Sequence, residues 1–375
     1  MFDVARCSSS ELTRGVVQVG LGVGLSAAVY GMANLHFRSL CRYFFRKPRP
    51  EEDGCCKLDF APSEIGWADR AFFVFCGVMW KAVKGVFGFR LDVKGRDEVE
   101  LPRLEVRCPV VVDGEQRELY KRALRDGKEE RGMGDLVEDF LLAALTNQLM
   151  LLLVVHPRLP ISPLGAVNVR NRIEFHQQQR CSVQEDQPLT AHAYLGGKSS
   201  LGRVTKRGVE IDIHVDVSNA SSPQALVLRQ VITILAPCKT TNTLPTAPSQ
   251  THSDETFHTT GAIDMSSSAP SLWSRVCGDY NPIHVSSTLA RLFGFRGKIA
   301  HGNHVVAKLL HLLPPGEQIA GQKGGAWWLE MQFKRPMVLP IRLTAQSSGS
   351  KDETRWRYIG DKDDKVYVSG SFGRL

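Results

Sequence analysis

Residues 135–155 read DLVEDFLLAALTNQLMLLLVV, and the fold is built around them. Its length and its run of strong helix formers predict a single helix of about six turns. Asp135 suits the N-cap, and His156-Pro157 ends the helix because proline cannot continue it. Apolar side chains lie on every side of such a helix, so other elements of the protein must bury it nearly all round.

Segments with the pattern of β-strands follow this helix. The predicted strands are 165–176, 189–195, 204–217 and 225–235. Alternation is clearest at Val209, Ile211, Ile213 and Val215, which places every second side chain on one face. We therefore expect an antiparallel sheet wrapped around helix 135–155, and we assign this first domain to residues 61–236.

The same order of elements returns near the C-terminus. Residues 302–313 predict a second amphipathic helix, closed by Pro314-Pro315. In the next strand Leu329, Met331 and Phe333 alternate with polar residues, and later strands are predicted at 341–347, 354–359 and 365–372. The pattern indicates an internal duplication of an α+β unit, with the second domain over residues 272–375.

Residues 237–271 are rich in Thr, Ser, Pro and His and lack periodicity. Such a composition cannot bury enough apolar surface to offset the entropy of ordering. The sequence therefore predicts a flexible connection between the two domains.

The N-terminal segment, residues 1–60, contains a stretch without Lys, Arg, Asp or Glu from Gly15 to Phe37. It is long enough to cross a bilayer as one helix, and the arginines and lysine that follow would keep the remaining chain on the cytosolic side. A cleaved organellar presequence, such as a mitochondrial one, is the alternative, because this segment is poor in acids. The ending Gly373-Arg374-Leu375 resembles a peroxisomal signal at its last two positions.

Composition excludes some classes of protein. The 47 Lys and Arg against 39 Asp and Glu give a net charge of +8, which favours anionic partners such as phosphate-bearing carriers. No basic run is interleaved with aromatic residues, so nucleic acid is not an expected partner. The nine cysteines include no C-x-x-C pair, so neither a disulfide framework nor a thiolate zinc site is predicted.

Residues 278–284 read GDYNPIH and place an acid, Asp279, five positions before an imidazole, His284. Pro282 stiffens the turn, so that the two side chains can converge on one water. A carboxylate hydrogen-bonded to His284 would raise the basicity of the ring, as water activation requires. The alternative is structural: an Asx-turn at Asp279 with His284 capping a helix.

Three histidines of the second helix region, His301, His304 and His311, raise the question of a metal site. They lack the accompanying carboxylate that supports a helix-borne zinc site, so no metal is expected there.

GDYNPIH followed by GKIAHG at residues 297–302 resembles the hydratase signature of the MaoC-like family, which includes the R-specific enoyl-CoA hydratases. Cys277 replaces the serine that usually precedes the first glycine. The resemblance covers residues 272–313, and 106–235 is more loosely similar to the partner domain of double hotdog dehydratases. It implies a double hotdog, with two antiparallel sheets each wrapped around a central helix, behind an N-terminal hydrophobic segment.

The resemblance also implies a reaction, the reversible hydration of a trans-2-enoyl thioester to the (R)-3-hydroxyacyl thioester without metal or redox cofactor. Asp279 and His284 would hold the water, the backbone N–H of Gly302 would bind the thioester carbonyl, and Asn281 would tie the loop together. A helix N-terminus suits that oxygen because negative charge develops on it.

Several alternatives remain open at this point. Arg296 and Lys298 either bind phosphates of the carrier, CoA or acyl carrier protein, or are solvated loop charges. The rival functions are a non-catalytic acyl-thioester binding module and a hotdog acyl-thioesterase. Self-association into a homodimer is also open, as are the acyl chain length and the identity of the base within the Asp279–His284 pair.

Overall fold

The structure is a computed structural model that describes residues 35–45, 55–61, 64–65, 77, 81, 93, 95–125, 135–163, 165–176, 188–197, 200–238, 256–312, 325–349 and 353–375. The chain divides into two compact units, Met1–Pro48 and Arg49–Leu375. The described part of the first unit is helix α2, Leu35–Phe45. Of the predicted membrane span, residues 15–34 lie outside the described residues, so the anchor stays a prediction.

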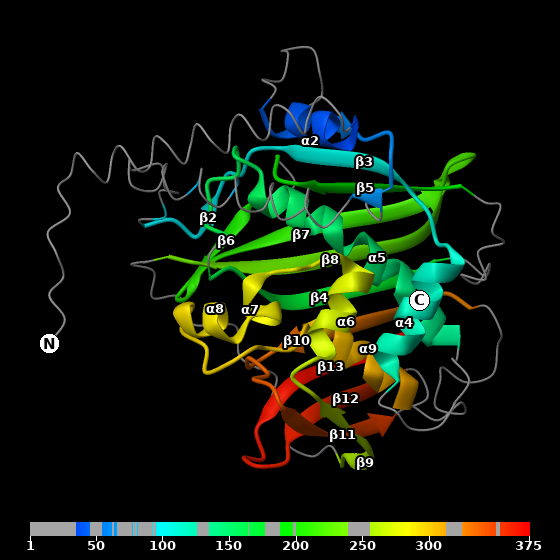
Figure 1. Cartoon of the computed structure of the whole chain (residues 1–375), viewed down its shortest axis with the longest axis vertical. Helices are drawn as coiled ribbons and strands as arrows, with labels where there is room; N and C mark the ends of the chain where they lie inside the picture. Colours follow the sequence, from blue (N-terminus) through cyan, green and yellow to red (C-terminus); the bar gives the residue numbers. More distant parts are fainter. Residues whose placement is uncertain are drawn as a thin grey trace, which may run out of the picture. The chain divides into compact units, whose positions relative to one another are not determined.

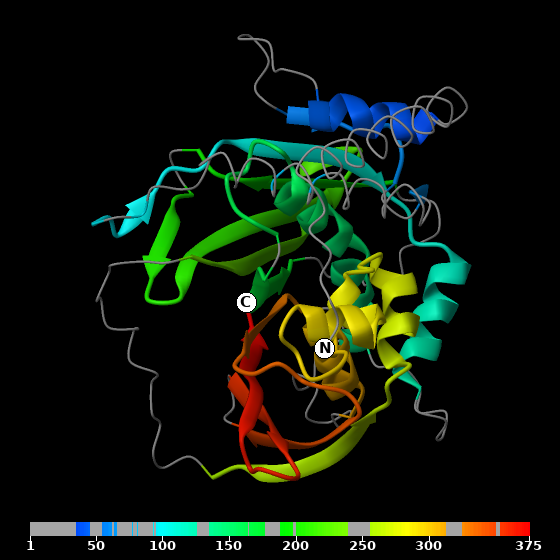
Figure 2. The same ribbon diagram turned by 60° about the vertical axis from the view of Figure 1, so that its left-hand side comes forward.

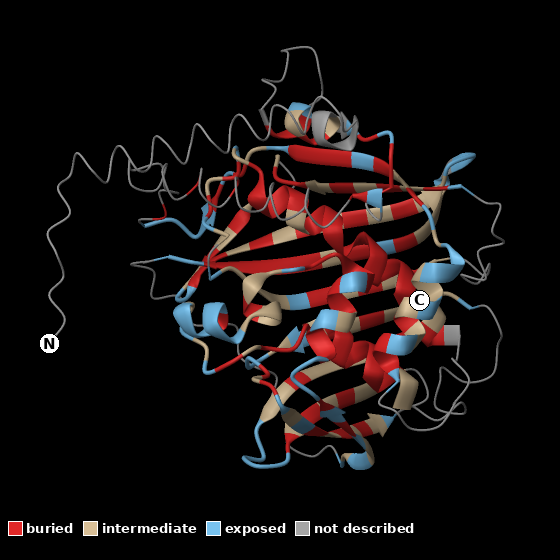
Figure 3. Ribbon diagram, viewed as in Figure 1, coloured by how far each residue is buried: buried red, intermediate tan, exposed pale blue. Residues whose placement is uncertain are grey.

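The larger unit begins with a helix and sheet that correspond to the first predicted domain. Its strands are β1 Cys55–Lys57, β2 Glu98–Val99, β3 Leu104–Val110, β4 Val167–Phe175, β5 Leu189–Leu195, β6 Gly202–Thr205, β7 Gly208–Asn219 and β8 Ser222–Pro237, and its helices are α4 Gly114–Leu124 and α5 Asp135–Val155. Helix α5 has the predicted bounds and packs against β3, β5, β7 and β8. Figure 3 shows this helix buried along most of its length.

The second half repeats the arrangement. Its helices are α6 Ala269–Cys277, α7 Pro282–Val285, α8 Ser287–Leu292 and α9 Gly302–Leu312, and its strands are β9 His258–Met265, β10 Trp327–Phe333, β11 Ile341–Gly349, β12 Glu353–Gly360 and β13 Val366–Arg374. Helix α9 contacts β9 and also α5, so the two central helices meet (Figure 1). The double hotdog class is confirmed, because each half wraps antiparallel strands around one central helix.

The two predicted sheets are joined into one. The strands run in the order β1-β3-β5-β7-β8-β4-β10-β13-β12-β11-β9, and every pairing on this path is antiparallel except β1 with β3. The seam is the β4–β10 pair, in which Ile173 lies opposite Leu329. The duplication therefore buries the sheet edges that two separate domains would expose.

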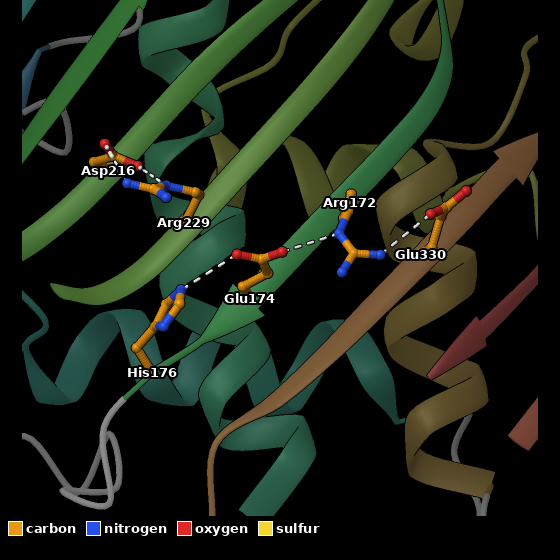
Figure 4. A network of polar contacts seen from close by, with 6 residues as sticks. All are labelled: Arg172, Glu174, His176, Asp216, Arg229 and Glu330. Carbon is orange, nitrogen blue, oxygen red and sulfur yellow. Dashed lines mark hydrogen bonds and ion pairs between the residues drawn. The ribbon is translucent and has the colours of Figure 1, made fainter. Parts of the chain in front are cut away.

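Charged side chains interact across the outer face of the β4–β10 seam. Arg172 on β4 bonds Glu174 at 3.0 Å and reaches across to Glu330 on β10 at 3.4 Å (Figure 4). The guanidinium also lies over the Trp328 ring, 4.8 Å from its centroid. Partly exposed ion pairs contribute about 0 to 1 kcal/mol each, so these pairs add little to the stability of the β4–β10 pairing.

The prediction of a flexible connection over 237–271 is wrong for residues 258–271, which form β9 and the start of α6. Strand β9 lies at the edge of the sheet, and Ile263 and Met265 are its two buried residues. An edge strand with so few inward side chains carries almost no periodic signal. The predicted strand 204–217 is likewise two strands, β6 and β7, separated at Lys206-Arg207.

Helix α5 contains the 20-residue apolar stretch Leu136–Val155, and among the described residues this is the one helix that is long and apolar enough to cross a membrane. In an 18-residue window of this stretch, 78% of the residues are buried inside the protein. The central helix of a hotdog is as long and as apolar as a membrane-spanning helix, because protein surrounds it on all sides.

Candidate active site

A sharp turn after α6 delivers the acid of the motif. Gly278 adopts a left-handed conformation with φ 66°, and its N–H bonds the carbonyl of Ser274 at 2.8 Å. Glycine accepts this conformation without steric cost, and it ends the helix. The next residue, Asp279, therefore points back into the protein, where it is 8% exposed.

The Asp279 carboxylate divides its two oxygens between structure and chemistry. Oδ1 accepts a hydrogen bond from the N–H of Asn281 at 3.0 Å, which closes an Asx-turn. Asn281 in turn caps α7, since its Oδ1 accepts from the N–H of Ile283 at 3.3 Å. The structural alternative is thus partly present, but it uses one oxygen and leaves Oδ2 facing the histidines. Asn281 does tie the loop together.

His284 is oriented by a backbone carbonyl. Its Nδ1 lies 2.8 Å from the oxygen of Ile299, and because a carbonyl can only accept, Nδ1 carries the proton in the neutral ring. The lone pair of that neutral ring is then on Nε2, which lies 4.0 Å from Asp279 Oδ2. The expected direct hydrogen bond, in which the carboxylate accepts from the imidazole, is therefore absent from this pair, because 4.0 Å is too long.

The gap between Asp279 and His284 has a definite chemical meaning. Both facing atoms are acceptors, and a water that donates a hydrogen bond of about 2.8 Å to each of them bridges atoms roughly 4 to 4.5 Å apart. The two side chains are 12% and 11% exposed, so a molecule held between them is nearly removed from bulk water. The arrangement can bind one water and polarise it from two sides.

Gly302 begins α9, where the first N–H groups have no carbonyl acceptor within the helix. No acid lies in the first turn of α9, so the positive end of the helix dipole is not neutralised. A Cβ at position 302 would overlap the ring of Phe333. Because of this close packing, the position requires glycine. The sequence pattern predicts Phe333, at the end of β10, only as an inward residue of its strand.

His301, the residue before Gly302, joins the pair. Its ring stacks on the His284 ring with 3.8 Å between centroids, and its Nε2 donates to the backbone oxygen of Asp279 at 3.1 Å. Burial, followed by repulsion from His284 and His304, holds the pKa of His301 well below its usual range. His301 is therefore neutral at the pH where enzymes work.

Asp279, His284 and His301 each offer an atom that could hold a metal ion, all within 4.8 Å of one another. This trio differs from the three helix histidines, since His304 stacks on Trp273 and donates to the oxygen of Ala123. A metal needs a nitrogen lone pair, whereas the His301 Nε2 that faces Asp279 carries the proton of a hydrogen bond. As arranged, the cluster is a hydrogen-bonded one, and the expectation of no metal stays a prediction.

The two predicted phosphate ligands lie nearer the surface. Arg296 is exposed and Lys298 is half-buried, and among the described residues neither forms an ion pair or a side-chain hydrogen bond. The loop that carries them is fixed by its backbone, since Leu339 N–H bonds the oxygen of Lys298 at 2.8 Å. Their role in binding stays a prediction.

A buried amide chain links the site to the first half of the molecule, and sequence reasoning missed it. Gln230 on β8 donates to Asn171 on β4 at 3.1 Å, and Asn171 donates to Asn303 on α9 at 3.2 Å. Asn171 and Gln230 are fully buried. Asn171 shares the inward face of β4 with Ile173 and Phe175, and a polar residue at an inward position was the available signal.

Residues 248–339 match the family model described as MaoC like domain, a range that contains Asp279, His284 and Gly302. The chain is 26% identical over 214 residues to 3-hydroxyacyl-thioester dehydratase X of Mycobacterium tuberculosis, covering 56% of this chain and 70% of that protein. The crystal structure of HtdX from Mycobacterium tuberculosis has a TM-score of 0.55 at 19% identity, covering 73% of this chain and all of that one. A MaoC-like dehydratase from Phytophthora capsici gives 0.53 at 12%, covering 74% and 96%. At these identities the structures support the fold alone.

Proposed function

Because this chain contains a MaoC-like dehydratase domain, we propose that it is a hydro-lyase acting on acyl thioesters of fatty acid metabolism. The reaction is the reversible addition of water to a trans-2-enoyl thioester, giving the (R)-3-hydroxyacyl thioester. One observation carries the proposal: Asp279 Oδ2 and His284 Nε2 face each other across 4.0 Å, next to the helix end at Gly302.

In the hydration direction the water oxygen bonds to the β-carbon while the carbon–carbon double bond opens. The neutral His284 ring presents the Nε2 lone pair that accepts a proton from the water, and Asp279 orients the same water. The pair returns a proton to the α-carbon on the same face, so both groups end as they began. Because Asp279 and His284 are a coupled pair, we assign the delivery of this proton to the pair and not to one of the two residues.

Negative charge grows on the thioester oxygen as the water adds. The N–H of Gly302 is the donor we assign to it, because the start of α9 offers free amides and an uncompensated dipole. The ring of Phe333 packs where a side chain at position 302 would otherwise stand.

We further propose that the thioester is carried by CoA or by acyl carrier protein, and that no metal or redox cofactor takes part. The acid/base pair supplies the proton transfer that the reaction needs, and the helix end supplies the charge stabilisation. The N-terminal segment would anchor the protein to a membrane with the catalytic part in the cytosol, with mitochondrial or peroxisomal import as alternatives. A homodimer is proposed as the assembly. Subcellular fractionation and sedimentation test these last two points.

The direct test is a hydration assay with a short and a long trans-2-enoyl-CoA, followed by loss of the conjugated absorbance. We expect a 3-hydroxyacyl-CoA, and chiral chromatography should identify the R enantiomer. Release of free CoA thiol would indicate a thioesterase instead, and binding without turnover would indicate a carrier module. Either result contradicts the proposal.

A further inference from the structure

His301 occupies a junction between the three parts of the proposed site. It precedes α9, and its carbonyl accepts the N–H groups of His304 at 3.1 Å and Val305 at 3.3 Å, so its backbone caps the helix. Its side chain is 6% exposed. The residue that starts the helix of Gly302 thus also places an imidazole inside the catalytic cluster.

The imidazole of His301 contacts both members of the acid/base pair. It stacks on His284 with 3.8 Å between centroids and 27° between planes. Its Nε2–H donates to the Asp279 backbone at 3.1 Å and lies 3.9 Å from the carboxylate Oδ2. One rigid ring therefore restrains the backbone of the acid and the plane of the base.

The restraint depends on His301 remaining neutral. The titratable groups that bear on it are His284, His304 and Asp279. His304 cannot compete for a proton, because burial, together with the charge of Lys308, lowers its pKa to about 3. A charged His301 would be a cation stacked on the ring that must itself accept a proton. The burial of His301 prevents this.

We propose that His301 is a positioning residue that holds the Asp279 backbone and the His284 ring at the separation that fits one water. It acts through these two groups and does not touch the reacting atoms. The proposal rests on the hydratase function proposed above. Placement matters here, because a shift of about 1 Å at a catalytic group can cost roughly 10²-fold in rate.

Two variants separate the contacts of this ring. His301→Phe keeps a flat ring for stacking and removes the N–H donor, whereas His301→Gln keeps an N–H donor and removes the ring. We expect kcat to fall by about 10-fold to 10²-fold in His301→Phe, with KM within about threefold, and less in His301→Gln. The dependence of kcat on pH should also change in both variants, because the separation of the acid/base pair changes. His311→Gln, in the last turn of α9, is the matched control.

Nitrogen NMR of histidine-labelled protein tests the geometry without any turnover. The signal lost in His301→Phe should belong, in the wild-type chain, to a neutral Nε2–H ring that does not titrate near the usual value of about 6.5. A His301 that titrates normally, or a folded His301→Phe enzyme with unchanged kcat and pH profile, overturns the proposal. An inactive wild-type enzyme would instead remove the proposed function, and with it this role, so the two failures are distinguishable.

Discussion

The two central helices occupy equivalent places in the two hotdogs, yet their first residues differ in charge. Helix α5 starts DLVED, with three acids in its first five residues, whereas α9 starts GNHVV with none. Acids in the first turn of a helix interact favourably with the positive end of the helix dipole and compensate its charge. Asp139 also accepts a hydrogen bond from Trp327 at 3.0 Å. The first turn of α9 has no acid, so its amides suit a developing oxyanion.

The first half is nevertheless part of the site. Its strands supply Asn171 and Gln230, which hold Asn303 in the first turn of α9. The two halves therefore have different roles: one carries the chemistry, and the other supports the helix that presents it. Matched changes in the two halves can separate these roles.

Loss of the acid/base pair, which only the second half is proposed to carry, should have the largest effect on turnover. Asp279→Asn and His284→Ala should each lower kcat by about 10²-fold or more, because general acid/base catalysis contributes that much. The double variant should be little worse than either single one, since the two act as a unit. The matched change in the first half, Glu138→Gln, should leave steady-state kcat within about twofold. Wild-type turnover in both site variants would rule out the assignment.

A methyl group at the start of α9 should be the next most damaging change. Gly302→Ala forces Cβ into the ring of Phe333 and displaces the amide, so we expect kcat to fall by about 10-fold to 10²-fold. Adding Phe333→Ala should restore part of the loss. In Gly261→Ala the new Cβ would lie 3.5 Å from Leu312, an ordinary contact, so this control should behave as wild type. Unchanged kinetics in Gly302→Ala would remove the oxyanion role.

The supporting role of the first half should appear as stability. Asn171→Ala leaves buried amides on Gln230 and Asn303 without this partner, so the free energy of unfolding should fall by about 1 to 3 kcal/mol. Urea titration measures it, and a cycle with Asn303→Ala should show non-additivity. Arg170→Ala, exposed on the same strand, should cost less than about 0.5 kcal/mol. Equal losses in the two variants would contradict the network.

Acid should weaken the second half through its buried histidines. His304 has a pKa of about 3 when folded and about 6.5 when unfolded, so the unfolded state binds more protons between these values. Its contribution is complete above pH 6.5 and is lost as the pH falls toward 3. His304→Phe keeps a ring beside Trp273 and should make the free energy of unfolding depend less steeply on pH from 6 to 4. His258→Phe, at an exposed position on β9, should leave the slope unchanged.

The smallest effect is expected at the surface. Arg296→Ala should raise KM for an enoyl-CoA by about twofold to fivefold without changing kcat, since an exposed charge pair contributes up to about 1 kcal/mol. The increase should shrink in high salt, which screens exposed charges. A KM that does not change would favour the solvated-loop interpretation of Arg296.

Much of the fold is readable from local pattern. Helix α5, strand β5 and the alternating strands of the second half lie close to where periodicity places them, because each buries one face against a core. Edge strand β9 was not readable for the opposite reason, since few of its side chains face inward. The join of the two sheets at β4 and β10 was not readable either, because backbone pairing between distant strands leaves no periodic mark.

The candidate site divides in the same way. The loop can be predicted from the sequence, since Gly278, Pro282 and the Asx-turn of Asp279 act within seven residues and depend only on local backbone preferences. Three other contacts depend on tertiary packing: the Ile299 carbonyl orients His284, the His301 ring stacks on the His284 ring, and Asn171 reaches α9 from the other half. These contacts join residues 15 to 132 positions apart, and only packing around the core sets such distances.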